Sequence, residues 1–256
     1  MKRTKIDWCD SSWSPISGCY HNCPYCYARG IATRFGGCDA SPRGETDAEI
    51  VDLVEPLKRT SKAGNKVYAA YPYGFTPTLH EYKLAELDKS GYGKTLFVCS
   101  MADMFGEWVP DDWIEKIFTA CRAHPEHRYL FLTKNPARYL ELGKAKKLPE
   151  DDNFWYGSTV TRPWQPVFYS GAHHTFVSVE PIHERLYEDC MSPSMTVDWA
   201  IFGAETGNRA EKVVPERSWI EDTVNALREA GKPVFMKDSM IPIWGEDIPR
   251  EFPWTD

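Results

Sequence analysis

FWYGSTV (residues 154–160), TFVSVE (175–180) and DWAIFGA (198–204) are the stretches that decide the fold of this 256-residue chain. Each is a nearly continuous apolar run, which is typical of a strand in a parallel sheet that is covered on both faces. Four more runs of this kind recur along the chain: KVYAAY (66–71), TLFVCS (95–100), RYLFLT (128–133) and PVFMK (233–237). Amphipathic segments such as 111–124 and 216–231 lie between the runs, so strands and helices are predicted to alternate.

Together with a strand expected near residues 5–17, these runs predict an α/β fold in the form of a complete or partial (β/α) barrel. No segment resembles a linker, so residues 1–256 are expected to form a single domain. It would carry a functional loop at 18–27 and a short C-terminal extension at 240–256. Because the chemistry of such barrels lies at the C-terminal ends of the strands, the polar residues that follow the runs are the candidate site residues.

The composition argues against a protein that binds long nucleic acids, spans a membrane or is secreted. The net charge is −7, and basic residues form only short groups, which argues against a protein that holds a long nucleic acid by its phosphates. No apolar stretch is long enough to span a membrane, and the first ten residues do not resemble a signal peptide. The sequence therefore predicts a cytoplasmic protein that acts on a small substrate.

The segment GCYHNCPYC (18–26) carries the chemistry. It places Cys19, Cys23 and Cys26 in a C-x3-C-x2-C pattern among loop residues. Three thiolates at this spacing suit three irons of a [4Fe-4S] cluster and leave the fourth iron open to another ligand. In enzymes that use S-adenosylmethionine (SAM) as a radical source, SAM binds that open iron, and one electron from the cluster cleaves SAM to a 5′-deoxyadenosyl radical.

The same loop has a second interpretation. His21 would complete a four-ligand zinc site with the three cysteines, although zinc sites usually draw their ligands from two separated pairs. The remaining cysteines are scattered, and Cys99 and Cys121 fall within a predicted strand and helix, where they are expected to pack as small apolar residues.

Further motifs extend the pattern over most of the chain. After DxxWxPxxGCxxxCxxCYA (10–28) come CSMADMFGEWVP (99–110), LTKNPARY (132–139), SVEP (178–181) and FGAETGNRA (202–210). In this order the motifs resemble the phage-type family of the radical SAM superfamily, to which the queuine lyases are similar. The resemblance implies a radical SAM barrel, a [4Fe-4S] cluster, SAM and an electron donor such as flavodoxin or ferredoxin. It also implies release of queuine from queuosine or its 5′-phosphate.

The resemblance also points to GFTP (74–77), which stands where the superfamily has a GGEP-like segment whose backbone contacts the SAM amino group. Gly74, Phe75 and Thr76 are therefore candidate SAM contacts, with Thr76 in the place of the usual glutamate.

Other residues are assigned from their chemistry and their positions after the runs. Tyr25, next to Cys26, is expected to stack on the adenine, and Asp103 to bind the SAM ribose. The other candidate contacts of SAM are Ser100, Lys134 and Ser158. Carboxylates accept hydrogen bonds from the donor edge of a guanine-like base, and basic side chains bind ribose phosphates or hydroxyls. The residues expected to bind the substrate are Glu180, Glu205, Arg209, Lys237 and Asp238.

The sequence thus favours an enzyme that cleaves SAM and acts on a small modified nucleoside or nucleotide. One alternative keeps the cofactors and changes the substrate to a base in DNA or RNA. Another, from a different class, is a non-enzymatic interaction protein organised by zinc.

Overall fold

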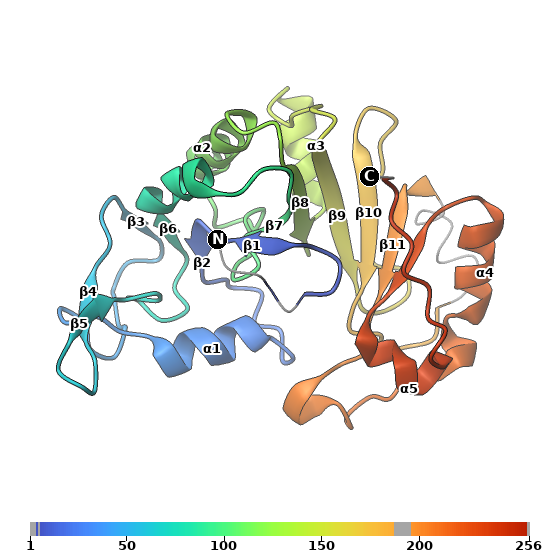
Figure 1. The fold of residues 1–256 in the computed structure, drawn as a ribbon, viewed down its shortest axis with the longest axis horizontal. Helices are drawn as coiled ribbons and strands as arrows, with labels where there is room; N and C mark the ends of the chain where they lie inside the picture. The colour runs from blue at the N-terminus through green and yellow to red at the C-terminus, as the bar shows by residue number, and fades with distance from the viewer. Residues whose placement is uncertain (1–3, 5, 187–195, 255–256) are drawn as a thin grey trace. The chain divides into compact units, whose positions relative to one another are not determined.

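The computed structural model describes residues 4, 6–186 and 196–254, and these gather into two compact units (Figure 1). Unit 1 is built from Ser11–Tyr129. Unit 2 is built from the chain after Tyr129 together with residues 6–10. The prediction of a single domain stays a prediction.

Seven strands follow one another in a sheet of order β1-β7-β8-β9-β10-β11-β12. Their bounds are β1 (Ser11–Trp13), β7 (Thr95–Val98), β8 (Arg128–Thr133), β9 (Phe154–Val160), β10 (His174–Val179), β11 (Trp199–Phe202) and β12 (Val234–Met236). The pairs β1–β7, β9–β10, β10–β11 and β11–β12 are parallel. In the described residues β1 and β12 stand at the two edges of this order and do not pair. The predicted α/β fold of parallel strands is confirmed, and the sheet is open rather than a complete barrel.

Unit 1 also contains a small sheet of order β2-β6-β3, made of β2 (Ile16–Ser17), β6 (Thr78–His80) and β3 (Val51–Leu53). Its helical segments are α1 (Tyr27–Phe35), the 3-10 helix η1 (Glu81–Lys89) and α2 (Asp111–Arg122). Helix α2 matches the predicted segment 111–124. Its first turn carries Asp111 and Asp112 and its last turn carries Arg122, which complements the helix dipole. The core-facing side of α2 buries residues such as Ile114, Ile117 and Phe118, as its spacing predicts.

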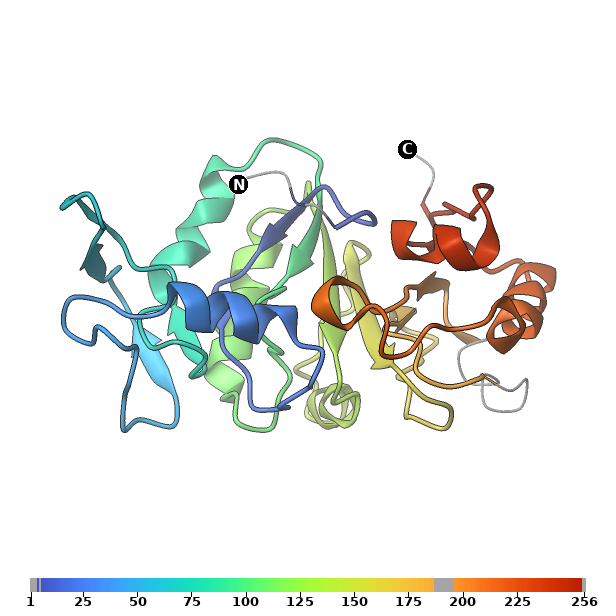
Figure 2. The same cartoon turned by 90° about the horizontal axis from the view of Figure 1, so that it is seen from below.

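The run KVYAAY is not a strand of the large sheet. Only Lys66–Tyr68 is extended (β5), and it pairs antiparallel with β4 (Lys58–Thr60) in a hairpin at the periphery of unit 1 (Figure 2). A turn closes the hairpin between Ser61 and Asn65, with Gly64 at positive φ. All three residues of β5 are exposed, so the prediction of a buried strand at 66–71 is wrong. The apolar composition of the run suggested a buried strand. The turn at 61–65 instead pairs β5 with β4 in a hairpin.

Unit 2 covers its strands with α3 (Ala137–Lys144) and α4 (Glu221–Glu229). Every residue of β9, β11 and β12 is buried, as the continuous apolar runs predict. The predicted helix at 216–231 is split into η5 (Arg217–Trp219) and α4. Three short helical turns complete the unit: η4 (Gly207–Arg209), η6 (Asp238–Met240) and α5 (Ile241–Trp244). In the C-terminal extension, backbone hydrogen bonds join Met236 to Pro249 and Glu251 to Val234, so residues 249–251 run along β12.

Among the described residues, no helix has the length and apolar character that a membrane span requires.

Candidate functional site

The cysteine loop connects β2 to α1 in unit 1. Cys19, Cys23 and Cys26 are half-buried free thiols. Burial is the main cause that raises the pKa of Cys19 to about 12, and the charge of Asp103 adds to it. Cys26 is also the N-cap of α1, where its Sγ accepts a hydrogen bond from the backbone N–H of Arg29 at 3.3 Å. The loop thus carries three thiols between β2 and α1, and the last of them caps the helix.

The segment GFTP lies directly against this loop. The backbone N–H of Cys19 donates to the carbonyl oxygen of Phe75 at 3.2 Å. Gly18 has a φ of +88°, and a Cβ at this position would lie 2.3 Å from the carbonyl oxygen of Thr76. Only glycine permits this approach without strain. The structure therefore brings Gly74–Thr76 and the cysteine loop together, although the run before GFTP is not the barrel strand that we expected.

His21 and Asp103 link the loop to the segment after β7. His21 Nε2 lies 2.8 Å from Asp103 Oδ2, and the imidazole packs edge-on against Trp108 with the ring centroids 4.9 Å apart. Asp103 also accepts a hydrogen bond from the backbone N–H of Phe105. The predicted ribose ligand Asp103 is therefore engaged with the cysteine loop itself, and His21 contacts a carboxylate.

A single zinc ion and a [4Fe-4S] cluster require different arrangements of the loop's ligands. Among the described residues, no three His, Cys, Asp or Glu side chains converge on a point that would hold a single metal ion. Zinc requires such convergence. A cubane does not, because its three thiolates bind three different irons, and N–H···S hydrogen bonds such as the one to Cys26 are typical of cluster ligands. Three thiols on one loop, with an N–H···S hydrogen bond to the third, are the kind of donor set that a [4Fe-4S] cluster uses, and the cluster stays a prediction.

Two other predicted SAM contacts lie in unit 1. Tyr25 is half-buried beside Cys26. The carbonyl of Ser100 accepts a hydrogen bond from the hydroxyl of Tyr27, the first residue of α1, and the Ser100 hydroxyl lies 3.3 Å from that of Ser14. Ser100 is thus connected to the helix that follows the cysteine loop.

Sequence reasoning missed Arg29, which contacts both the loop and GFTP. Its Nη2 donates to the carbonyl of Cys19 at 3.3 Å, and its guanidinium lies over the ring of Phe75, 4.8 Å from the centroid. Its Nε is buried and makes no hydrogen bond. The available signal was its position three residues after the last cysteine, on the first turn of the helix that this cysteine caps.

The predicted substrate residues belong to unit 2, where Glu205 is the most buried of them. Its side chain is only 3% exposed. Oε1 accepts a hydrogen bond from Arg209 Nε, whereas Oε2 makes no hydrogen bond and lies 3.4 Å from His183 Nε2. The carboxylate is thus held through one oxygen, while the other oxygen is without a hydrogen-bond donor.

Glu180 and Lys237 form an ion pair at the C-terminal ends of β10 and β12, with Nζ 2.5 Å from Oε1. The strand between them ends at Phe202, and Gly203 follows. A Cβ on Gly203 would lie 2.9 Å from Lys237 Cδ and 3.1 Å from Glu180 Cδ, so glycine leaves room for the pair. Glu180 and Lys237 lie at the C-terminal ends of their strands, as we expected. Their charges are paired with each other.

The other candidates of unit 2 have structural partners. Asp238 is bound by Arg250, which also pairs with Asp7. Ser158 lies within β9, fully buried, and its hydroxyl accepts the backbone N–H of Phe168 at 2.9 Å. Lys134 follows β8 and is exposed.

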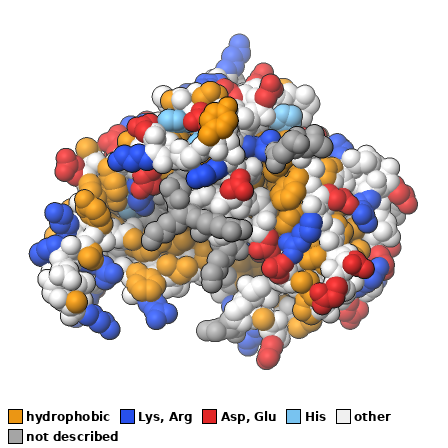
Figure 3. Space-filling model, viewed as in Figure 1, with side chains coloured by type: hydrophobic (Ala, Val, Ile, Leu, Met, Phe, Trp, Pro, Cys, Tyr) orange, Lys and Arg blue, Asp and Glu red, His pale blue; other side chains and the backbone are white. Residues whose placement is uncertain are grey.

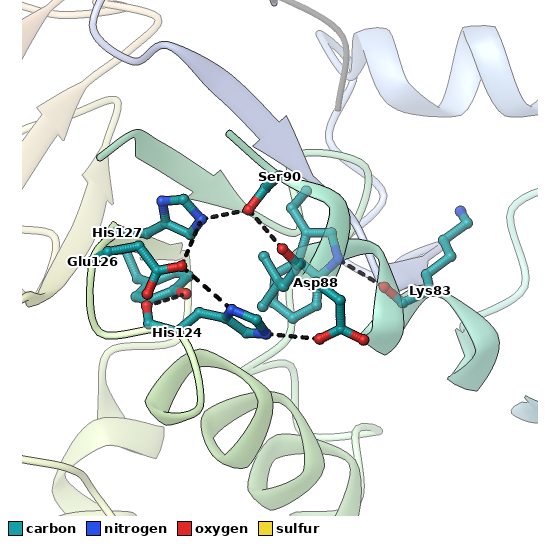
Figure 4. Close-up of polar contacts among 9 residues, drawn as sticks. Lys83, Asp88, Ser90, His124, Glu126 and His127 are labelled. Carbon is teal, nitrogen blue, oxygen red and sulfur yellow. Dashed lines mark hydrogen bonds and ion pairs between the residues drawn. The ribbon is translucent and has the colours of Figure 1, made fainter. Parts of the chain in front are cut away.

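Unit 1 contains a second polar cluster that resembles a hydrolytic site (Figure 4). Ser90 Oγ lies 2.5 Å from His127 Nε2, and Glu126 stands beside the imidazole. The backbone N–H of Lys94, however, donates to Nδ1 of His127, so the neutral ring carries its proton on Nε2. Ser90 in turn donates its hydroxyl proton to the carbonyl of Leu87. His127 therefore donates to Ser90 and cannot take its proton, and the cluster ties the end of η1 to the segment before β8.

The fold and the loop together define an α/β protein with three thiols on the loop that leads into a helix. A family model of proteins of unknown function, DUF5131, matches residues 3–251, and the chain belongs to this family. No curated protein matches the chain. No solved structure matches it either.

This match corrects the family that the motifs indicated. The family model that matches is DUF5131 and not the radical SAM superfamily or its phage-type family, and the large sheet is open rather than closed into a complete barrel. The prediction of that family is wrong. Most of the short motifs that indicated it have no specific chemical requirement, and among them only the cysteine spacing has one. The release of queuine and the role of GFTP in binding the SAM amino group lose the support of the resemblance and stay untested predictions.

Proposed function

We propose that the cysteine loop holds a [4Fe-4S] cluster on Cys19, Cys23 and Cys26 and that the protein cleaves SAM to act on a small nucleoside or nucleotide. The observation that carries the proposal is the loop itself, which spaces three thiols in a C-x3-C-x2-C pattern and whose backbone is fixed by GFTP and α1. When bound, the cluster would supply one electron to SAM, breaking the S–C5′ bond and giving a 5′-deoxyadenosyl radical. An oxygen-sensitive group of this kind fits the reducing cytoplasm and an electron donor such as flavodoxin or ferredoxin.

The residues of the chain would then bind and orient the reactants. The contact of Gly18 with the Thr76 carbonyl and the His21–Asp103 pair hold the loop in place. Backbone groups of Gly74–Thr76 and the ring of Tyr25 are the proposed contacts of SAM. A positioned reactant matters here because a primary alkyl radical must meet its target C–H bond before it meets the protein.

Glu205 is the residue we propose for substrate recognition in unit 2. Its Oε2 is buried without a hydrogen-bond donor, which is costly for a carboxylate unless a ligand supplies one. The donor edge of a guanine-like base would do so. The Glu180–Lys237 pair, Arg209 and Asp238 are proposed to bind the remaining polar groups of the substrate.

The proposal is tested by anaerobic reconstitution with iron and sulfide, followed by incubation with SAM, a reductant and a panel of nucleosides that includes queuosine. We expect about four irons per chain and 5′-deoxyadenosine in the products, with free base where the glycosidic bond breaks. Cys23→Ala should remove iron and product together, whereas Cys9→Ala, which changes a thiol outside the loop, should keep both. One zinc per chain without iron, or an intact cluster that gives no 5′-deoxyadenosine, would refute the proposal.

A base within RNA or DNA is the second candidate substrate, and the β4–β5 hairpin is the observation that favours it. Residues 58–68 contain Lys58, Arg59, Lys62 and Lys66 and no acidic residue, and Tyr68 is 69% exposed. Figure 3 shows Lys and Arg side chains around this part of unit 1. Affinity for a short RNA that falls steeply between 50 and 200 mM salt would support this substrate. Affinity that salt leaves unchanged would exclude it.

A further inference from the structure

We infer that Arg29 is an anion-binding residue of the cysteine loop and that its ligand is the carboxylate of the methionine moiety of SAM. The inference rests on the proposed function and adds a specific residue to it. It starts from the contacts that the Arg29 side chain makes with both the loop and GFTP.

The guanidinium of Arg29 is fixed on two sides. Its Nη2 donates to the Cys19 carbonyl, and its face lies on the Phe75 ring. Its own backbone N–H donates to Cys26 Sγ, so the residue touches the first and the third cysteine of the loop. A planar, pre-oriented guanidinium is the side chain best suited to recognise a carboxylate through two parallel hydrogen bonds.

Among the described residues, no carboxylate balances the charge of Arg29. In the described part of the protein no ion pair to Arg29 is found, and its Nε is buried without a hydrogen bond. By contrast, Arg209, Arg228 and Arg250 each lie against a carboxylate. A partly buried cation with an unused donor is costly to the folded protein, and an anionic ligand would remove that cost.

The loop predicts which anion this is. Three cysteines leave one iron of the cluster open, and the ligand proposed there is SAM, whose amino acid end carries a carboxylate. Arg29 stands on the first turn of the helix that begins at the last cysteine, so it can act on this carboxylate without being a ligand of iron.

The experiment measures binding rather than turnover. Reconstituted wild type, Arg29→Gln and Arg29→Lys are titrated anaerobically with SAM and with decarboxylated SAM, and iron content and the EPR spectrum of the reduced cluster are recorded with and without ligand. We expect Arg29→Gln to bind SAM at least tenfold more weakly, to leave the affinity for decarboxylated SAM unchanged and to keep its iron. Arg29→Lys should be intermediate. Arg34→Gln is the matched control, because Arg34 lies on the same helix over the ring of Phe35 and should leave every value unchanged.

Each other outcome has a definite meaning. Equal weakening for both ligands, or loss of iron in both Arg29 variants, would show that Arg29 only supports the loop and would overturn the inference. A changed EPR spectrum without SAM, with unchanged SAM affinity, would show that Arg29 neutralises the cluster, and would overturn it too. If wild type itself binds no iron, the proposed function fails before Arg29 is reached.

Discussion

Phe75 accepts a hydrogen bond from the backbone N–H of Cys19, which ties GFTP to the cysteine loop over 3.2 Å. The residue before Cys19 makes this approach possible. Gly18 has positive φ, and its Cα faces the carbonyl oxygens of Phe75 and Thr76 at a distance that leaves no space for a side chain. The geometry of the loop therefore depends on a backbone contact between segments far apart in the sequence.

Gly18→Ala should damage the loop without touching a thiol. The added Cβ would lie 2.3 Å from the Thr76 oxygen, and alanine at a φ of +88° is strained as well. We expect a loss of about 2 kcal/mol or more in the free energy of unfolding and poor iron incorporation. Urea unfolding and iron analysis check this.

Gly30→Ala is the matched control for that variant. Gly30 lies on α1, and a Cβ there would have no heavy atom within 4 Å. Since alanine favours a helix over glycine by about 1 kcal/mol, this variant should be stabilised and keep its iron. If Gly18→Ala behaved like Gly30→Ala, the contact between GFTP and the loop would not matter for the site.

The stability of the protein should fall as the pH falls below about 6.5, because His80 is buried. Burial, with a smaller effect of the positive charge of Lys83, lowers the pKa of His80 to about 3. The imidazole is fully buried between Ser17 and Tyr82. A histidine whose folded pKa is lowered contributes its full stability above its unfolded pKa of about 6.5, and this contribution is lost as the pH falls toward 3. The loss should be on the order of a few kcal/mol over that window.

Urea unfolding at several pH values between 7 and 4 measures the effect. His80→Gln should be less stable than wild type at pH 7, since it changes both hydrogen bonds, but its stability should depend less on pH. A residual slope is expected from His127, whose pKa is also lowered by burial. Parallel curves for wild type and His80→Gln would show that His80 is not the cause.

Ser90→Ala tests the proton positions in the second polar cluster of unit 1. If His127 donates to Ser90, as the hydrogen bond from Lys94 requires, Ser90 is not a nucleophile. Wild type should not react with a fluorophosphonate probe. The variant should lose about 1–3 kcal/mol of stability, because Nε2–H of a buried imidazole loses its acceptor. Labelling of Ser90 in wild type would contradict this assignment.

The sequence predicts the strands of the large sheet better than it predicts the site. Runs such as 154–160 and 175–180 are apolar because both faces of the sheet are covered, and this requirement is local enough to be read from the residues. The contact of Cys19 with Phe75 and the pairing of His21 with Asp103 join segments far apart in the chain, and no periodicity encodes them. Arg29 escaped attention because an arginine on a helix is usually solvated, and its contacts with Cys19 and Phe75 are visible only in the folded chain.

Glu205→Gln tests substrate recognition in unit 2. The glutamine keeps an oxygen acceptor but loses the negative charge that holds Arg209 and that would receive the donor edge of the base. Hydrogen bonds to charged groups contribute roughly 1.5–3 kcal/mol, so we expect substrate binding to weaken by tenfold or more. SAM cleavage in the absence of substrate should stay near the wild-type rate, because Glu205 has no role proposed in it. Glu221→Gln is the matched control, since Glu221 also pairs with an arginine four positions away, on an exposed surface. Equal loss of both reactions in Glu205→Gln would show that the residue supports the fold of unit 2, and an unchanged substrate affinity would remove Glu205 from the binding site.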